Sequence, residues 1–239
     1  MECLPNCAMP GRDGTPPATA SSRSWAPPRG LRETDRMPQR LSYSPATADR
    51  WDDVRSLFGP NGAYSNCWCT WWILTGPQFD RATPEERRSV LEALCAEGSA
   101  PGILAYEEDR PVGWVAVGPR ERYARMMSPR ARVNGPLDFA DPGWVVNCFY
   151  IPTRERGHGI ASGLLGEAVG FAFDRGANYV TGHPIDVEEG AGPGAAGLFV
   201  GTLSMFLRAG FVEVERRGGR PVVRIDPHGY REHREERRH

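Results

Sequence analysis

The sequence lacks several features that would assign a protein to a class at once. No apolar run approaches the roughly 20 residues that a membrane-spanning helix needs, and the N-terminus lacks the apolar core of a signal peptide. Neither sign of charge dominates, because 29 basic and 30 acidic residues leave a formal net charge of −1. We therefore expect neither nucleic acid nor a membrane surface as a partner.

The cysteines also lack the spacing of a secreted disulfide framework, so a reducing cytoplasm is the expected location. They are Cys3, Cys7, Cys67, Cys69, Cys95 and Cys148. The 239 residues are 40% hydrophobic and 25% charged, which allows one good-sized domain with a tail. We expect a disordered Pro/Ser/Arg-rich tail at residues 1–39, the domain at residues 40–227 and a charged tail at residues 228–239.

What the chain does contain is a strand, a glycine-rich turn and a helix in direct succession. Residues 144–151 are apolar and partly β-branched, which is typical of a mostly buried strand, and Pro152 ends the strand because it has no N–H. In the helix that follows, apolar residues recur on one face over three turns, and Gly176 is placed to end it. This face consists of Ala161, Leu164, Leu165, Ala168, Val169, Ala172 and Phe173.

The turn between them suits a phosphate group. Gly157 and Gly159 permit positive φ and carry no Cβ that would keep a ligand away from the backbone. The first amides of the helix have no intrahelical partner, and the helix dipole adds partial positive charge there. A dinucleotide fingerprint is excluded because Ser162 occupies the third glycine position, and the Walker Gly-Lys-Ser/Thr pattern is absent.

The turn sequence resembles the Q/R-x-x-G-x-G/A signature of the GNAT superfamily of acyl-CoA-dependent N-acyltransferases. The resemblance covers about residues 40–226 and implies an α/β fold: a mixed, mostly antiparallel central sheet flanked by helices, with a splayed strand pair that holds acetyl-CoA. It implies that the pyrophosphate lies on the amides of Arg156, Gly157, His158, Gly159, Ile160 and Ala161. It also implies that the acyl arm follows Cys148, Phe149, Tyr150 and Ile151. The alternative is a glycine-rich loop without a ligand.

Local patterns predict further elements along the chain. They are a helix from Thr47 to about Phe58, a helix opened by a capping box at Thr83 and running to about Glu97, a hairpin at residues 103–117, a strand at residues 178–183, a helical face formed by Leu198, Phe199, Leu203, Phe206 and Leu207, and a closing hairpin at residues 212–225.

Residues 67–72 hold three tryptophans and two cysteines, and their role stays open. They form a buried aromatic segment or the wall of the acceptor pocket, since a large aromatic side chain serves both. A metal on Cys67 and Cys69 is a weaker alternative, because tetrahedral sites need four ligands, and we assign no metal ligand.

Residues 119–143 are irregular and rich in arginine. We consider a phosphate clamp, a patch for an acidic substrate, and a solvated surface loop, and favour the last because charge runs usually face water. The arginines are Arg120, Arg122, Arg125, Arg130 and Arg132.

Acyl transfer to an amine needs a base for the amine proton and a donor for the developing oxyanion. His183, at the end of the strand next to the central one, is the candidate base, because imidazole titrates near neutral pH. A polar loop histidine without a catalytic role is the alternative. The resemblance implies a tyrosine in the last helix that protonates the leaving thiolate, but Phe206 occupies that position. Ser204 or a water would then replace it, or coenzyme A would leave as a thiolate.

The function that these observations favour is transfer of an acetyl group from acetyl-CoA to the primary amine of a small molecule or peptide. A non-catalytic acyl-CoA-binding or regulatory module on the same fold is the alternative, motivated by the missing tyrosine. Asp186, Glu188 and Glu189 would attract a cationic amine or form an acidic surface loop. The sequence names neither the acceptor nor the oligomeric state, for which a homodimer is one option.

Overall fold

The computed structural model describes residues 41–128, 142–187 and 195–236, all within a compact unit that spans Gln39–His239. Expectations that concern residues 1–40, 129–141, 188–194 and 237–239 lie outside the described residues. These include the disordered tail, Arg130, Arg132, Glu188 and Glu189. Among the described helices, none combines the length and the hydropathy that a bilayer span requires.

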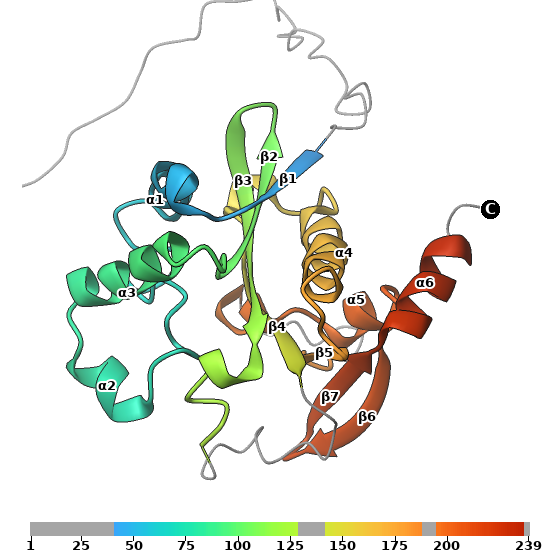
Figure 1. Ribbon diagram of the computed structural model, residues 1–239. Coiled ribbons are helices and arrows are strands. Elements are labelled where there is room, and N and C mark those ends of the chain that lie inside the picture. Colours follow the sequence, from blue (N-terminus) through green and yellow to red (C-terminus); the bar gives the residue numbers. More distant parts are fainter. Residues whose placement is uncertain (1–40, 129–141, 188–194, 237–239) are drawn as a thin grey trace, which may run out of the picture. The chain divides into compact units, whose positions relative to one another are not determined.

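A mixed sheet runs through the described residues in the order β1-β2-β3-β4-β5-β7-β6 (Figure 1). Neighbouring strands are antiparallel except β4 and β5, which run parallel. The expected mostly antiparallel α/β fold is therefore confirmed. The strands are β1 (Leu41–Pro45), β2 (Gly102–Glu107), β3 (Arg110–Pro119), β4 (Gly143–Tyr150), β5 (Tyr179–Gly182), β6 (Val212–Arg217) and β7 (Arg220–Ile225).

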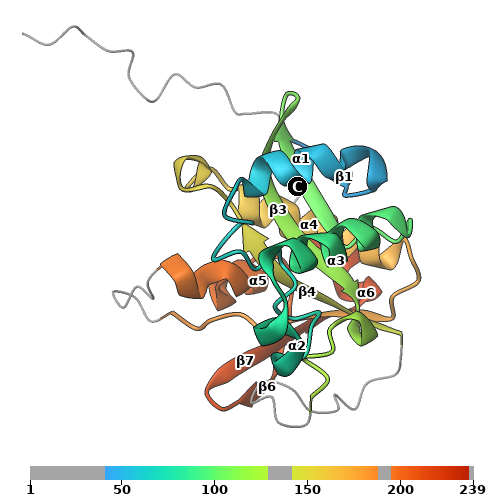
Figure 2. The same ribbon diagram turned by 90° about the vertical axis from the view of Figure 1, so that its left-hand side faces the viewer.

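Helices cover both faces of this sheet. One group lies on one face and comprises α1 (Trp51–Phe58), α2 (Gly76–Arg81) and α3 (Pro84–Ala96) (Figures 1 and 2). The other face carries α4 (Ile160–Phe173), α5 (Leu203–Leu207) and α6 (Pro227–Glu236). Short 3-10 helices add Ala48–Arg50, Arg120–Arg122, Thr153–Glu155 and Ala195–Val200.

Each face of the sheet has its own apolar core. On the α4 face, Leu164, Leu165 and Ala168 are fully buried against sheet residues such as Val146 and Val180, which confirms the apolar face expected for this helix. On the opposite face, side chains of α1 and α3 and the segment 63–73 pack against alternate residues of β2, β3 and β4. Alternation along the strands sends successive side chains to opposite cores.

The capping box at Thr83 is present as expected. The Glu86 N–H donates to the Thr83 Oγ1 at 3.2 Å, and the Thr83 N–H donates to the Glu86 carboxylate at 2.7 Å. A second box, in which the Thr75 N–H donates to the Gln78 Oε1 at 3.0 Å, opens α2. Apolar periodicity did not predict α2, because six residues do not complete two turns of a helix.

Two expectations about the C-terminal third differ from the structure. The helical face from Leu198 to Leu207 is divided, because Gly201 at φ +79° ends the 3-10 helix and Thr202 caps a new one. Residues beyond 227 form α6 rather than a charged tail up to Glu236, and the Tyr230 ring packs 5.4 Å from that of Phe173. One packed ring in an otherwise charged segment gave no signal of a helix in the sequence.

Candidate functional site

The strands β4 and β5 pair along less than half the length of β4. Their register runs from Gly143 opposite Tyr179 to Val145 opposite Thr181, and no further pair follows in the described residues. On its other edge β4 stays paired with β3 as far as Tyr150 opposite Trp114. Among the residues that the structure describes, 146–150 therefore have no strand partner on the β5 side, so this edge of β4 is a candidate site for a ligand that binds backbone groups.

A β-bulge lies in the part of β4 that is paired with β3 but not with β5. Phe149 pairs with Val115 and Asn147 pairs with Ala116, so that Cys148 is the extra residue, with φ +51°. Positive φ is uncommon for a side chain with a Cβ, and a bulge re-aims the residues around it. The Cys148 Sγ lies 3.0 Å from the Cys69 Sγ on the face opposite α4.

The glycine-rich turn follows β4 and leads directly into α4. Gly157 has φ +84° and Gly159, the N-cap of α4, has φ +76°. A Cβ built on either glycine would meet no atom within 4 Å, so the backbone of the turn is open. Since α4 is 14 residues long, its N-terminal amides and dipole point to the same opening.

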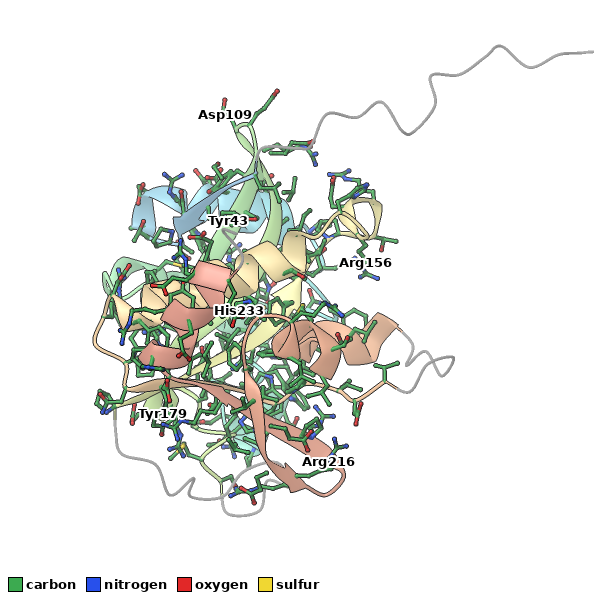
Figure 3. All side chains as sticks on the ribbon, turned by 90° about the vertical axis from the view of Figure 1, so that its right-hand side faces the viewer. Tyr43, Asp109, Arg156, Tyr179, Arg216 and His233 are labelled. Carbon is green, nitrogen blue, oxygen red and sulfur yellow. The ribbon has the colours of Figure 1, made fainter. Side chains whose placement is uncertain are left out.

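Charged side chains hold the turn in this shape. Glu155 is buried and accepts from the Arg110 Nη1 at 2.6 Å and from the Arg154 Nε at 3.0 Å. The hydrogen bond from Arg110 is the main reason why the pKa of Glu155 lies below its usual range, against the opposing effect of burial. The Arg156 Nε donates to the Ile151 carbonyl at 3.1 Å, and Arg156 lies on the outside of the turn (Figure 3).

His183 follows the last residue of β5 and is buried. Burial, with the positive charges of Arg217, Arg220 and Arg120, lowers its pKa to about 4. Its Nδ1 is buried and has no hydrogen-bond partner among the described residues. The imidazole is therefore neutral at pH 7 and able to accept a proton, although a pKa this low makes it a weak base.

Asn147 has a similar surrounding on β4. It lies two residues beyond Val145, as His183 lies two residues beyond Thr181, so the register places both on the face opposite α4 where the strands separate. The Asn147 Nδ2 lies 3.8 Å from the Met126 Sδ, and its buried Oδ1 has no partner in the part of the chain that the structure describes. Buried polar atoms are almost always hydrogen-bonded in native proteins, so the side chains of Asn147 and His183 are candidates to bind a ligand or a water.

Ser204, the candidate general acid, lies on α5 two residues before Phe206, which occupies the position of the family's tyrosine. Phe206 is fully buried, and its ring lies 6.2 Å from that of Phe149, so it adjoins the unpaired part of β4. Ser204 is exposed, and its Oγ lies 3.2 Å from the Thr202 Oγ1. The hydroxyl of Ser204 is thus paired with Thr202, whereas the side chain that adjoins β4, Phe206, cannot donate a proton.

The segment 67–72 forms part of the core on the face opposite α4. Trp68, Trp72 and Cys69 are buried, while Trp71 is partly exposed and carries the Arg125 guanidinium 3.9 Å above its ring. Within the described ranges, no group of three or more His, Cys, Asp or Glu side chains is arranged to hold a metal ion. The core interpretation is thus confirmed for these three residues, and the pocket-wall interpretation stays a prediction.

The described arginines of the segment 119–128 are not a solvated run. Arg120 is buried and donates to the Tyr179 hydroxyl at 2.9 Å, Arg122 donates to the carbonyls of Ser99 and Ala100, and Arg125 lies over Trp71. The favoured surface-loop interpretation is wrong for Arg120, which is buried. Arg122 and Arg125 are partly exposed, and each guanidinium has acceptors or an aromatic face that the local sequence does not reveal. Asp186, by contrast, is exposed and forms an ion pair with Arg216 at 2.8 Å.

Two residues of the site were not singled out by sequence. Asn147 is a polar residue within an otherwise apolar strand, and that interruption was the available signal. Glu155 was hidden between Arg154 and Arg156 in a charged run, and only the tertiary contact with Arg110 distinguishes it from a surface residue.

Comparison with known proteins assigns the family. The model of the acetyltransferase (GNAT) family matches residues 68–198, which is more than half of the 239 residues. The chain belongs to the GNAT acetyltransferase family. No curated protein matches the chain.

Solved structures share the fold at low sequence identity. An uncharacterized protein from Bacillus halodurans is 12% identical with a TM-score of 0.50, over 82% of this chain and 89% of that chain. An N-acetyltransferase from Staphylococcus aureus Mu50 is 14% identical with a TM-score of 0.45, over 78% and 98%. An N-acetyltransferase from Thermoplasma acidophilum, in complex with coenzyme A, is 10% identical with a TM-score of 0.44, over 78% and 98%.

Proposed function

We propose that this chain is an N-acetyltransferase that moves an acetyl group from acetyl-CoA to the primary amine of a small molecule or peptide by direct attack. Acetyl-CoA is the co-substrate that membership of the GNAT acetyltransferase family implies. The observation that carries the proposal is the combination of an open glycine turn at the start of α4 and an unpaired strand edge beside it.

The turn fits a pyrophosphate for physical reasons. The amides from Arg156 to Ala161 lie at the N-terminus of a long helix, where anions are stabilised, and no side chain fills the space over Gly157 or Gly159. Residues from Cys148 to Ile151 would hold the acyl arm through backbone groups that lack a strand partner. The ion pair of the exposed Arg110 with the buried Glu155 keeps the turn in position.

The residues of the chain would divide the chemistry as follows. Bound acetyl-CoA supplies a thioester carbonyl to the attacking amine. A backbone N–H of the unpaired part of β4 donates to the developing oxyanion. His183, neutral at pH 7, accepts the amine proton directly or through a water, and Asn147 orients the amine through its free Oδ1.

Protonation of the leaving sulfur needs no strong acid. A free thiol has a pKa near ~8.5, so coenzyme A leaves as a thiolate or takes a proton from water at neutral pH. Ser204 stays a proposal for this step and would need to turn from Thr202 toward β4. The acceptor class, a homodimer and location in the cytoplasm also stay predictions.

The second candidate is an acyl-CoA-binding or regulatory module without turnover. The phenylalanine at position 206 and the low pKa of His183 favour it, because both remove proton-transfer capacity from the site. Measurement of coenzyme A release by chromatography over a panel of amines separates the two functions. The chain contains no lysine, so acetylation of its own lysine side chains does not confuse the assay.

Matched alanine variants at the two ends of α4 test the binding site. Gly159 and Gly176 have nearly the same φ, +76° and +80°, and both have open space where a Cβ would lie. Replacing either by alanine therefore adds similar backbone strain. We expect Gly159→Ala to weaken acetyl-CoA binding by about tenfold or more, a loss of about 1.4 kcal/mol, while Gly176→Ala leaves binding unchanged. Equal affinities of the two variants, measured by calorimetry, would reject the phosphate turn.

A further inference from the structure

Three thiols converge on the face of the sheet opposite α4. The Cys148 Sγ, on the β-bulge, lies 3.0 Å from the Cys69 Sγ. Cys67 lies two residues before Cys69, and the Cys69 thiol is the main influence on the pKa of Cys67. All three are free thiols; Cys69 and Cys148 are buried, and Cys67 is partly exposed.

The three thiols differ in reactivity. The hydrogen bond from Cys69 is the main reason why the pKa of Cys67 falls to about 7, with smaller contributions from backbone N–H groups and the charge of Arg87. Burial raises the pKa of Cys69 well above its ordinary value, and that of Cys95 on α3 to about 12. The thiolate therefore forms on Cys67, the one of these thiols that solvent reaches, and the thiolate is the nucleophilic form.

The backbone is strained at both cysteines whose sulfurs meet in the core. Cys69 has φ +53° and Cys148 has φ +51°, conformations that residues with a Cβ seldom adopt. Such strained residues persist only where the surrounding structure determines them, and they concentrate at functional positions. A disulfide bond is about 2.05 Å long, so a movement of roughly 1 Å would join these sulfurs.

We propose that Cys67, Cys69 and Cys148 form an oxidation site, at which a hydroperoxide converts Cys69 and Cys148 into a disulfide that lowers acetyl transfer. The first part rests on the three thiols alone. The second part rests on the proposed function, because the disulfide would pull on the bulge next to Phe149, in the strand assigned to the acyl arm. Displacement of a reacting group by 1 Å can cost about 100-fold in rate.

The chemistry balances in three steps. The Cys67 thiolate attacks one oxygen of hydrogen peroxide, the O–O bond breaks, and Cys67 becomes a sulfenic acid while hydroxide leaves and takes up a proton as water. The Cys69 sulfur displaces the sulfenic hydroxyl, which leaves as a second water, and a Cys67–Cys69 disulfide forms. The Cys148 sulfur then attacks the Cys69 Sγ, and Cys67 leaves as the thiolate that its low pKa favours. In sum, two thiols and one peroxide give one disulfide and two waters.

Peptide mapping of the full chain tests the linkage. Trypsin cuts only after arginine here, because lysine is absent, and it separates residues 56–81, with Cys67 and Cys69, from residues 133–154, with Cys148. After peroxide and alkylation of the remaining thiols, we expect these two peptides to be joined and to separate again with dithiothreitol. Cys95, on another peptide, should stay alkylated. Oxidation that stops at a Cys67–Cys69 disulfide or at a sulfinic acid on Cys67 would overturn the proposal.

Variants assign the roles of the cysteines. Cys67→Ser should slow the formation of the joined peptides by about tenfold or more, since it removes the thiolate that reacts with peroxide first. Any peptides that still join in this variant identify Cys69 as the partner of Cys148. Cys69→Ser should abolish the linkage, and Cys69→Ala serves if the serine variant does not fold. Cys95→Ser should change nothing. Unchanged joining in Cys69→Ser would contradict the assignment.

The activity measurement is kept separate from the linkage. We expect peroxide to lower acetyl transfer by the wild-type chain about tenfold, reductant to restore it, and Cys69→Ser to stay active in peroxide. If the linkage forms and neither transfer nor acetyl-CoA affinity changes, the regulatory part is wrong. If the reduced chain transfers no acetyl group at all, the proposed catalytic function has failed, and the effect of the disulfide is then read from the acetyl-CoA dissociation constant.

Discussion

The two sides of β4 are built in opposite ways. On the side of the turn that leads into α4, positive φ occurs at Gly157 and Gly159, and the buried carboxylate of Glu155 is paired with two arginines. On the opposite side, residues with a Cβ take positive φ and buried polar atoms lack partners. Among the described residues, those with positive φ include Ala63, Ser65, Asn66, Trp68, Cys69 and Cys148, and the unpartnered atoms include those of Trp72, Trp114, Tyr123, Asn147 and His183.

This difference indicates what each side does. Local sequence preferences, such as glycine at positive φ, are sufficient to form the turn, because a diphosphate site needs only open amides and a helix dipole. On the other side, residues depart from their local conformational preferences, and such departures are expected at functional or strained sites. The strain there is maintained by packing around Trp68, Trp72 and Cys69. We therefore expect changes at the glycines of the turn to act on binding and a change at the paired carboxylate of Glu155 to act on stability. Changes on the other side should act on chemistry and stability.

The largest expected effect concerns His183. If it accepts the amine proton, His183→Gln should lower kcat/KM by about 100-fold, because a positioned base contributes that much or more. His228→Gln, at an exposed position on α6, is the matched control and should leave the rate unchanged. Steady-state kinetics with an amine identified from the panel measure both. An unaffected rate in His183→Gln would mean that another group accepts the amine proton, and it would weaken the contrast between the two sides of β4.

The second effect is the pH dependence of stability that His183 imposes. Its folded pKa of about 4 lies below the unfolded value near ~6.5, so the unfolded chain binds the proton more tightly. Stability is therefore complete above about pH 6.5 and is lost as the pH falls toward 4, by about 3 kcal/mol. Urea unfolding between pH 7 and 4 should show this loss for the wild type and a smaller one for His183→Gln. Parallel curves for the two proteins would contradict the assignment of this pKa.

A smaller effect is expected at Glu155 on the turn side. Glu155→Gln removes the charge that pairs with Arg110 and Arg154 and should lower the free energy of unfolding by about 2 kcal/mol. Because the pKa of Glu155 is depressed by these partners, the wild-type advantage should be present above about pH 4.3 and disappear as the pH falls below it. Glu92→Gln, exposed on α3, is the control and should shift the urea midpoint very little.

The smallest effect tests the strain directly. Ser65 is exposed and has φ +49°, so Ser65→Gly should raise the free energy of unfolding by about 0.5–1 kcal/mol, because glycine adopts this region without a Cβ clash. Ser56→Gly, exposed within α1, should do the opposite by a similar amount, since glycine disfavours a helix interior. Thermal unfolding of both variants measures the contrast. A loss of stability in Ser65→Gly would show that no strain is stored there.

The sequence by itself determined the strand, turn and helix from Trp144 to Phe173, the capping box at Thr83 and the hairpins. These features follow from spacing, glycine at positive φ and side-chain capping, which act over a few residues. The family resemblance implied a splayed strand pair, but only the tertiary structure decided that β4 and β5 separate after Val145, that Cys69 meets Cys148, and that Arg120, Arg122 and Arg125 have partners. Each of these depends on residues far apart in the chain, and local periodicity carries no information on which distant groups will meet.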